Sequence, residues 1–341
     1  MSERGSDNAS VSRSFLFYRR LIKLTLAVSV VAIFVFVIGF IWVSAVLQRP
    51  SLATQDIILE IKPGDGRVVI SQRLNHIGLS HHPLVYRIEE WRRGKGYLPK
   101  AGEYRFMADG TLSEAMDIIH KGVPIQHDLT ISEGLSSQQI VALLENDDRL
   151  SGAITNLPDE GSLLPETYSF SRHTDRNALI RRMQQSQEIK FAEIWSSRDP
   201  DHILKTLEDA VILASIVEKE TGIADERGLV ASVFLNRMKA SMKLQSDPTV
   251  LYGLEQDGIV VESLLRSHLK HDSPWNTYRI KALPPSPISN PGLATFLAVV
   301  KPEASDYFYF VADGKGGHRF AKTYDQHKAN IKLWKETTGD N

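Results

Sequence analysis

Two glutamates at the end of one apolar helix are the residues in this sequence best suited to acid–base chemistry. Glu218 and Glu220 end a segment that begins with an unbroken apolar run, Ala210 to Ala214, and a helix that is apolar on all sides is expected to be buried. A carboxyl group at the edge of a core is poorly solvated, which raises its pKa and lets it donate a proton near neutral pH. The pattern therefore predicts a general acid at this helix end.

The two glutamates are not expected to act as a pair. Residues two positions apart on a helix are about 200° apart around its axis, so Glu218 and Glu220 point to nearly opposite sides. Glu218 lies over two small residues, Ala214 and Ser215, which leave space for a ligand, whereas Glu220 lies over bulkier side chains and is expected to pack. Glu218 is therefore the preferred acid. The alternative is that both are solvated helix-end charges that pair with neighbouring Lys or Arg side chains.

The elements that must position these glutamates are mostly helical from about residue 156 to 341. The glutamate-bearing helix is predicted to begin after Thr206 as N-cap and to end at Gly222 in the C′ position. The other elements expected here are helices over 175–195, from Asp225, over 292–300 and over 323–336, and a hairpin of strands 307–311 and 318–321. Pro291 is expected at the first position of the helix over 292–300.

A different pattern fills residues 56–155, where an extended segment, a glycine turn and a capped helix recur three times. Two of these helices open with capping boxes, Thr111 with Glu114 and Ser136 with Gln139. Strand-plus-helix units of this kind resemble LysM-like modules, which bind glycans that contain N-acetylglucosamine. The pattern alone gives equal weight to an α+β spacer with no binding role.

The N-terminal part predicts a membrane anchor. Residues 24–47 carry no charge, and about 24 residues at about 1.5 Å each give about 36 Å, enough to cross a hydrocarbon core of about 30 Å. Arg and Lys residues precede this run, so residues 1–23 are expected to form a cytoplasmic tail, with a linker over 48–55 and everything after it outside. A cleaved signal peptide is the competing interpretation.

Composition narrows the possible functions. The 341 residues have room for two domains, and 40 Lys and Arg against 41 Asp and Glu give no sign of a nucleic-acid partner. The chain has no cysteine, so disulfides and thiolate sites are excluded, and no His pair has the spacing of metal ligands. We expect neither a metal nor a cofactor.

Several further motifs follow one another in a fixed order. They are Gly161-Ser-Leu-Leu-Pro-Glu-Thr-Tyr168, Ala214-Ser-Ile-Val-Glu-Lys-Glu-Thr-Gly222, Leu244-Gln-Ser-Asp-Pro-Thr-Val250, Asn276-Thr-Tyr278, Leu283-Pro-Pro-Ser-Pro-Ile-Ser-Asn-Pro-Gly292, and Tyr309-Phe-Val-Ala-Asp313 with His318-Arg-Phe320. In this order they resemble the MltG (YceG-like) family of endolytic murein transglycosylases. Together with the anchor and the LysM-like pattern, the resemblance covers nearly all of the chain.

This resemblance implies an α+β protein with a single transmembrane helix, a LysM-like module over 56–155 and a mainly helical catalytic domain over 156–341. It implies a lyase of the inner membrane that cuts nascent peptidoglycan strands between N-acetylmuramic acid and N-acetylglucosamine and leaves 1,6-anhydro ends. Glu218 would act first as acid and then as base. Cell-wall synthases are the protein partners that the family suggests. The alternatives are a non-catalytic peptidoglycan scaffold and a hydrolase that pairs Glu218 with Asp247 or Glu166.

Candidate substrate-binding residues accompany the acid. Amide and hydroxyl groups suit sugar N-acetyl and hydroxyl groups, and an aromatic ring can stack on a sugar ring; Asp247 is as well explained as an N-cap before Pro248, and Glu166 and Tyr168 as parts of a structural turn. The full set is Gln245, Ser246, Asp247, Asn276, Tyr278, Asn290, Glu166 and Tyr168.

Overall fold

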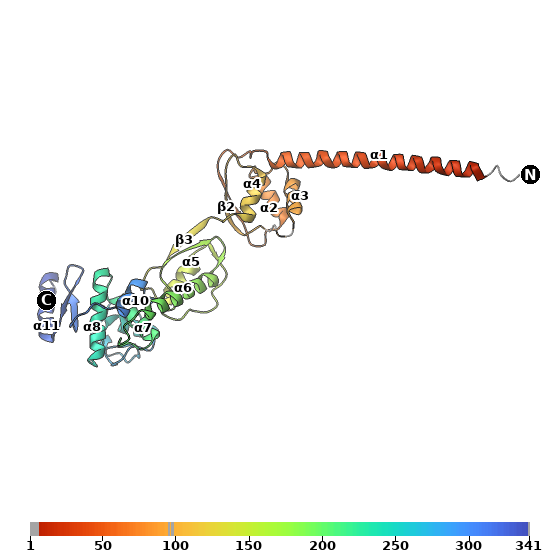
Figure 1. Cartoon of the computed structure of the whole chain (residues 1–341). Helices are drawn as coiled ribbons and strands as arrows, with labels where there is room; N and C mark the ends of the chain where they lie inside the picture. The colour runs from red at the N-terminus through yellow and green to blue at the C-terminus, as the bar shows by residue number, and fades with distance from the viewer. Residues whose placement is uncertain (1–6, 95, 97–98, 340–341) are drawn as a thin grey trace, which may run out of the picture. The chain divides into compact units, whose positions relative to one another are not determined.

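The chain folds into two compact units, residues up to 125 and residues from 126 onward (Figure 1). The computed structural model describes residues 7–94, 96 and 99–339. The described part is a mixture of helices and small two-stranded sheets. This agrees with the α+β class expected from the sequence.

The first unit is built on one antiparallel strand pair with helices packed against it. Its elements are α1 (Asp7–Leu47), β1 (Ile57–Ile61), α2 (Arg67–His76), α3 (Pro83–Arg93), β2 (Gly102–Phe106) and α4 (Leu112–Lys121). In the sheet, Ile57 of β1 lies opposite Phe106 of β2. The core of this unit includes Val46 and Leu47, so the last turn of α1 belongs to the folded module.

The N-terminal helix is longer than the apolar run that predicts it. Within the described residues, Tyr18–Leu47 is long and apolar enough to cross a membrane by length and composition. Residues 1–6 of the expected cytoplasmic tail lie outside the described residues, and the rest of that tail is helical as part of α1. The expected linker is also structured, because the N–H of Ser51 donates to Gly110 O at 2.9 Å and that of Leu52 to Gly78 O at 3.0 Å.

The second unit contains the helix of the two glutamates. Its elements are β3 (Gln126–Thr130), α5 (Ser137–Asn146), β4 (Leu150–Ser151), β5 (Thr167–Ser171), β6 (Thr174–Asp175), α6 (Arg176–Ser196), α7 (Leu207–Glu220), the 3₁₀ turn Ala224–Glu226, α8 (Arg227–Lys239), α9 (Asp247–Gln256), the 3₁₀ turn His268–Lys270, α10 (Leu293–Val300), β7 (Tyr309–Ala312), β8 (His318–Ala321) and α11 (Tyr324–Thr338). Strands β7 and β8 form the expected hairpin.

The division between the units falls earlier than the expected boundary near residue 155. Strand β3 pairs antiparallel with β5, with Thr130 opposite Thr167, and β4 pairs in parallel with β6. These pairings attach residues 126–155 to the second unit. The strand–turn–helix pattern there resembles the one before it, and a local pattern does not reveal that its strand pairs with a partner some 40 residues later in the chain.

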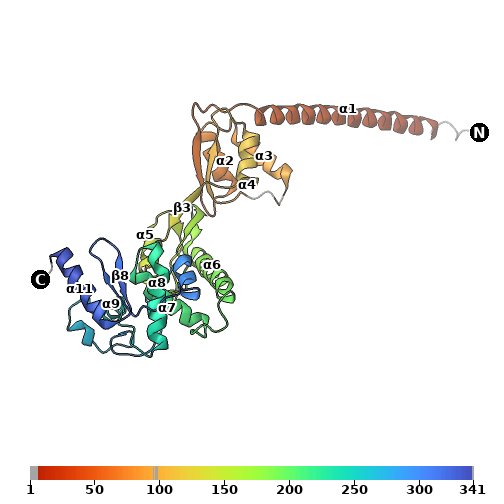
Figure 2. The same cartoon turned by 60° about the vertical axis from the view of Figure 1, so that its left-hand side comes forward.

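Helix α7 lies at the centre of the second unit, beside α8 and α10 (Figure 2). Every residue from Ala210 to Val217 is buried, as predicted. The predicted N-cap is also confirmed, because Thr206 accepts a hydrogen bond from the N–H of Asp209 at 3.0 Å. The predicted end is also confirmed, because Thr221 is the C-cap and Gly222 follows it at C′, although Gly222 does not adopt the left-handed conformation common at that position.

Two other predicted helix N-termini are confirmed and one is wrong. The capping boxes at Thr111 and Ser136 are both formed. Pro291 does not open α10, because the N-cap of that helix is Gly292. A Cβ atom at Gly292 would lie 1.8 Å from Glu133 Oε1, so a larger residue here would force the Glu133 side chain to move.

Candidate active site

Glu220 lies in a polar cluster that the sequence did not predict for it. The Ser246 hydroxyl donates a hydrogen bond of 2.5 Å to Glu220 Oε1. The pKa of Glu220 is raised to about 7. Burial is the largest cause and the charge of Asp247 acts in the same direction, against the lowering effects of Ser246, His318 and Arg237. The expectation that Glu220 only packs against aliphatic side chains is therefore wrong, since its carboxyl group faces hydrogen-bonding and charged groups.

The segment that brings Ser246 to Glu220 is fixed by a neighbouring loop. Gln245 is exposed and adopts a left-handed conformation with φ 52°, and its N–H donates to Thr277 O at 3.3 Å. The N–H of Ser246 donates to Thr277 Oγ1 at 2.9 Å. The fully buried Thr249 adds a hydrogen bond of 2.6 Å to Ser246 O. The position of the Ser246 hydroxyl is thus set by buried hydroxyl groups on both sides.

Asp247 and Tyr278 extend the cluster toward solvent. The Tyr278 hydroxyl donates to Asp247 Oδ1 at 2.5 Å, and burial together with this carboxylate raises the pKa of Tyr278. Asp247 itself is exposed and is the first residue of α9. The N-cap of α9 is Ser246, so the alternative role of Asp247 as an N-cap is wrong. Ser246 makes no side-chain capping bond, because its hydroxyl is directed to Glu220.

Arg237 supplies a positive charge to this cluster and was missed by the sequence analysis. Its guanidinium donates to Phe308 O at 2.7 Å and to Leu244 O, and it lies 5.5 Å from the centre of the Tyr309 ring. Burial lowers the pKa of Arg237, while Glu220 is among the groups that raise it. The signal for it was present, since Arg237 is a charged residue within the otherwise apolar face of a helix. We call Glu220, Ser246, Asp247, Tyr278 and Arg237 the Glu220 cluster.

Glu218 lies in a second cluster on the other side of the helix end. Its carboxylate accepts a hydrogen bond of 2.9 Å from the N–H of Gly292, at the start of α10, and lies 3.8 Å from Arg227. Its side chain is only 5% exposed. Both partners suit an ionised carboxylate, because one is a helix N-terminus and the other a guanidinium.

We expected the small residues beneath Glu218 to leave room for a ligand, and this prediction is wrong. The N–H of Ile288 donates to Ser215 Oγ at 3.0 Å, and the Ser289 hydroxyl donates to Ser215 O at 3.1 Å. The space above Ser215 is therefore occupied by the segment that leads into α10. The small side chains allow two parts of the chain to approach each other.

Glu133 completes the second cluster. Arg227 donates to Glu133 Oε2 at 2.9 Å, and the Glu133 side chain is 39% exposed. Burial and the charge of Glu218 raise the pKa of Glu133, whereas Arg227 lowers it. Glu218, Glu133, Arg227 and Gly292, here called the Glu218 cluster, join α7, α8, α10 and the loop before α5.

The two predicted asparagines serve the fold. Asn276 and Asn290 are both fully buried. The Asn276 amide donates to His271 O at 2.7 Å and accepts from the N–H of Tyr278 at 3.0 Å, so it shapes the loop that carries Tyr278. Asn290 accepts from the N–H of Leu163 at 2.9 Å and donates to Ser137 Oγ and Leu135 O at 3.1 Å each. Their amide groups are thus used within the protein.

Tyr168 lies in β5, and Glu166 directly precedes this strand and contacts α6. Glu166 forms an ion pair with Lys190 of α6, and the Tyr168 hydroxyl donates to Leu164 O at 2.7 Å. Their surroundings match the structural-turn alternative. The structure thus brings Gln245, Ser246, Asp247 and Tyr278 to Glu220, and it places the other predicted residues elsewhere.

Comparisons with known proteins agree with the motif pattern. Residues 59–333 match the model of the YceG-like family. The chain is 32% identical over 212 residues to the endolytic murein transglycosylase of Bacillus subtilis (strain 168), covering 56% of each protein. It is 26% identical over 317 residues to the one from Streptococcus pneumoniae serotype 2 (strain D39), covering 80% of this chain and 57% of that protein. The chain thus spans just over half the length of these relatives.

A solved structure is similar to most of the chain. It is a 2.6 Å crystal structure of a YceG-like protein from Listeria monocytogenes, with a TM-score of 0.50 and 27% sequence identity. The match covers 81% of this chain and 99% of that one. The overall arrangement of elements is therefore shared with a protein of the same description.

Proposed function

The chain belongs to the YceG-like family, and from this premise we propose that it is an endolytic murein transglycosylase, the activity for which its Bacillus and Streptococcus relatives are named. It cuts peptidoglycan strands internally, between N-acetylmuramic acid and N-acetylglucosamine, and leaves a 1,6-anhydro end. The observation that carries the proposal is a carboxyl group whose burial raises its pKa to about 7, at the end of a buried helix and among polar groups.

We propose Glu220 as the general acid, in place of the Glu218 that the sequence favoured. A general acid must hold a proton near neutral pH, and a pKa of about 7 meets this requirement. The carboxyl group of Glu218 instead accepts a hydrogen bond from the N–H of Gly292 and lies 3.8 Å from Arg227. Its role in this proposal is to join α7 to α8 and α10.

One carboxyl group is sufficient for this reaction. Protonated Glu220 donates its proton to the glycosidic oxygen as the C1–O bond breaks and an oxocarbenium-like state forms at C1. The resulting carboxylate then removes the proton from the C6 hydroxyl, whose oxygen bonds to C1 and closes the anhydro ring. Ordinary glycosidases need a second carboxylate as nucleophile or base. Here the nucleophile belongs to the substrate.

Ser246 assists both steps, the donation of a proton by Glu220 and the later removal of a proton from the C6 hydroxyl. Its hydroxyl donates to Oε1 of Glu220, which leaves Oε2 to carry the proton that is transferred. After the transfer, the same hydrogen bond stabilises the carboxylate, and the charge of Arg237 adds to this effect. We expect Gln245 and Asp247, which are exposed on either side of Ser246 in the sequence, to contact sugar hydroxyl and N-acetyl groups.

The location follows from α1. We propose that this helix anchors the chain in the inner membrane with its N-terminus in the cytoplasm, because Arg19, Arg20 and Lys23 precede the apolar run. Both units then lie on the outer side, where newly made glycan strands and the synthases that produce them are found. The first unit is proposed to bind glycan as a LysM-like module.

The product ends test the proposed reaction. The full chain in detergent or nanodiscs is incubated with glycan strands, and the released ends are measured by mass spectrometry. We expect anhydro ends, which are lighter than reducing ends by one water. Reducing ends would instead assign a hydrolase, for which Asp247 beside Glu220 is the candidate second carboxylate. Binding without new ends would assign a scaffold.

A further inference from the structure

Helix α3 of the first unit exposes an apolar face. Leu84, Ile88 and Trp91 follow one another at positions i, i+4 and i+7, so they lie on one side of the helix. They are 51%, 44% and 79% exposed. On the other side, Val85 and Tyr86 are fully buried in the core. A tryptophan with most of its surface exposed is unusual on a helix that already has a well-packed face.

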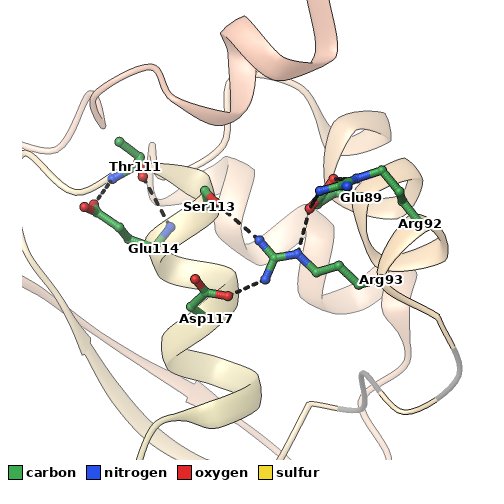
Figure 3. A network of polar contacts seen from close by, with 7 residues as sticks. All are labelled: Glu89, Arg92, Arg93, Thr111, Ser113, Glu114 and Asp117. Carbon is green, nitrogen blue, oxygen red and sulfur yellow. Dashed lines mark hydrogen bonds and ion pairs between the residues drawn. The ribbon is translucent and has the colours of Figure 1, made fainter. Parts of the chain in front are cut away.

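The orientation of this helix is fixed by a network of charged groups (Figure 3). Glu89, whose side chain is 1% exposed, accepts from Arg92 at 2.6 Å and from Arg93 at 2.7 Å. Arg93 also bonds to Asp117 and Ser113 of α4. Because this network holds one side of α3 to α4, rotating the helix to cover Trp91 would break several partly buried charge-assisted hydrogen bonds.

The exposed face lies beside the last turns of α1. Both views show α3 next to this end of α1 (Figures 1 and 2), and the two helices are in contact. A groove of about 570 Å³ lies between them, and its lining is almost entirely apolar. The large apolar side chains that line it include Phe36, Phe40, Trp42 and Val43 of α1 with Ile88 and Trp91 of α3.

The depth of this groove can be compared with the thickness of a bilayer. If Lys23 marks the inner boundary, about 20 residues at about 1.5 Å each fill a hydrocarbon core of about 30 Å and end near Val43. The groove begins at Phe36, about 10 Å below that outer boundary by the same rise per residue. Amphipathic helices at a membrane surface bury their apolar face by about 5–10 Å. The face of α3 is therefore at interfacial depth.

We propose that α3 is an interfacial helix, whose Leu84, Ile88 and Trp91 enter the outer leaflet beside α1. The inference rests on the proposed membrane anchor. Exposed Arg67 and Arg87, on or near this face, are positioned to meet the phosphates of anionic headgroups, since their long side chains can reach from the interface. The first unit is then held on the membrane by two contacts, and it does not swing freely on a tether.

The absence of cysteine in the sequence makes a direct test possible. Single variants Ile88→Cys, Val30→Cys and Val123→Cys of the full chain carry a nitroxide label in nanodiscs that contain anionic phospholipid. All three side chains are exposed, Ile88 on α3, Val30 on α1 and Val123 at 79% elsewhere in the first unit. Collisions with oxygen, which dissolves in lipid, are compared with collisions with a water-soluble nickel chelate.

We expect the label at Ile88 to resemble that at Val30, with nickel accessibility at least about fivefold lower than at Val123. If Ile88 matches Val123 while Val30 is lipid-exposed, the anchor stands and the interfacial helix is refuted. If Val30 is also water-exposed, the anchor fails and the inference fails with it. In nanodiscs of zwitterionic lipid alone, we expect the label at Ile88 to move toward the water-exposed value. No difference between the two lipids would overturn the role given to Arg67 and Arg87.

Discussion

The Glu220 cluster and the Glu218 cluster lie on opposite sides of the same helix turn, and their partners differ. Glu220 faces a serine hydroxyl, with Asp247 close by, and burial raises its pKa to about 7. Glu218 faces a helix N-terminus and an arginine, which suit a negative charge. Two identical side chains from one helix end are therefore prepared for different tasks. The difference comes from the segments that pack against α7, since both residues belong to its last turn.

The largest effect is expected on turnover. Glu220→Gln removes the proposed proton donor but keeps the shape and can still accept the Ser246 hydrogen bond, so activity should fall by about 10³-fold, within the range for general acid–base catalysis. The matched control is Glu218→Gln on the other side of the helix, which should keep activity within about tenfold of wild type, a modest loss. Anhydro ends released per minute measure both. Loss of activity in Glu218→Gln with activity retained in Glu220→Gln would reverse the assignment.

The pH dependence of activity should report the protonation of Glu220. Glu220 must be protonated to act as acid, so activity should fall above about pH 7, approaching about tenfold per pH unit. Ser246→Ala removes a hydrogen bond that favours the ionised carboxylate, so the pKa rises and the fall moves to higher pH. The rate of anhydro-end formation between pH 5 and 9 measures this. If Ser246→Ala does not shift the pH at which activity falls, the fall is not due to ionisation of Glu220.

Two variants, one in each cluster, should change the pH dependence of stability in opposite directions. The pKa of Glu220 is raised above its ordinary value of 4.5, so wild-type stability falls as pH rises from about 4.5 through 7, by up to about 3 kcal/mol. Glu220→Gln removes this fall. Arg227→Met removes the cation that lowers the pKa of Glu133, so it steepens the fall, by at most about 1 kcal/mol because solvent screens the partly exposed Glu133.

Urea denaturation at pH 5 and pH 8 measures both variants. The comparison fails if Arg227→Met and Glu220→Gln change the pH dependence in the same direction. Arg237→Met is a less useful probe, because that guanidinium also holds two backbone carbonyl groups and its loss disturbs the fold directly.

The smallest effect is expected at the edge of the Glu220 cluster. Tyr278→Phe removes the hydrogen bond to exposed Asp247, and one such bond is worth about 1 kcal/mol, or about fivefold in kcat/KM. Tyr168→Phe is the matched control, since its hydroxyl donates to Leu164 O in a part of the unit that the proposal keeps apart from the reaction. It should lower stability by a similar amount and leave kcat/KM unchanged. Equal changes in kcat/KM for both tyrosines would remove Tyr278 from the site.

The sequence predicted the elements of the second unit better than their contacts. The N-cap at Thr206 and the burial of Ala210 to Val217 follow from patterns within one helix, and both are confirmed. Patterns within one helix could not tell which of the two glutamates has the raised pKa, because this depends on partners that are distant in the sequence. Ser246 is 26 residues from Glu220, and Gly292 is 74 residues from Glu218. The small residues beneath Glu218 were interpreted as space for a ligand, but other parts of the chain fill that space.

The sequence also could not tell which of the predicted binding residues are exposed and which are used within the fold. A side-chain amide can bind a sugar or satisfy backbone groups of a buried loop, and only its burial distinguishes the two roles. Asn276 and Asn290 are buried and bonded within the protein, whereas Gln245 is exposed beside Ser246. The expected boundary near residue 155 differs from the observed division after residue 125 because β3 pairs with β5, which is distant in the sequence.

The central claim is that Glu220 keeps its proton near neutral pH, and an NMR titration of that side chain tests it most directly. The full chain is labelled with ¹³C at glutamate carboxyl carbons, and the Glu220→Gln variant identifies the signal by its disappearance. The account predicts a midpoint near pH 7 for Glu220. A midpoint near 4.5, the ordinary value for a glutamate, would contradict it.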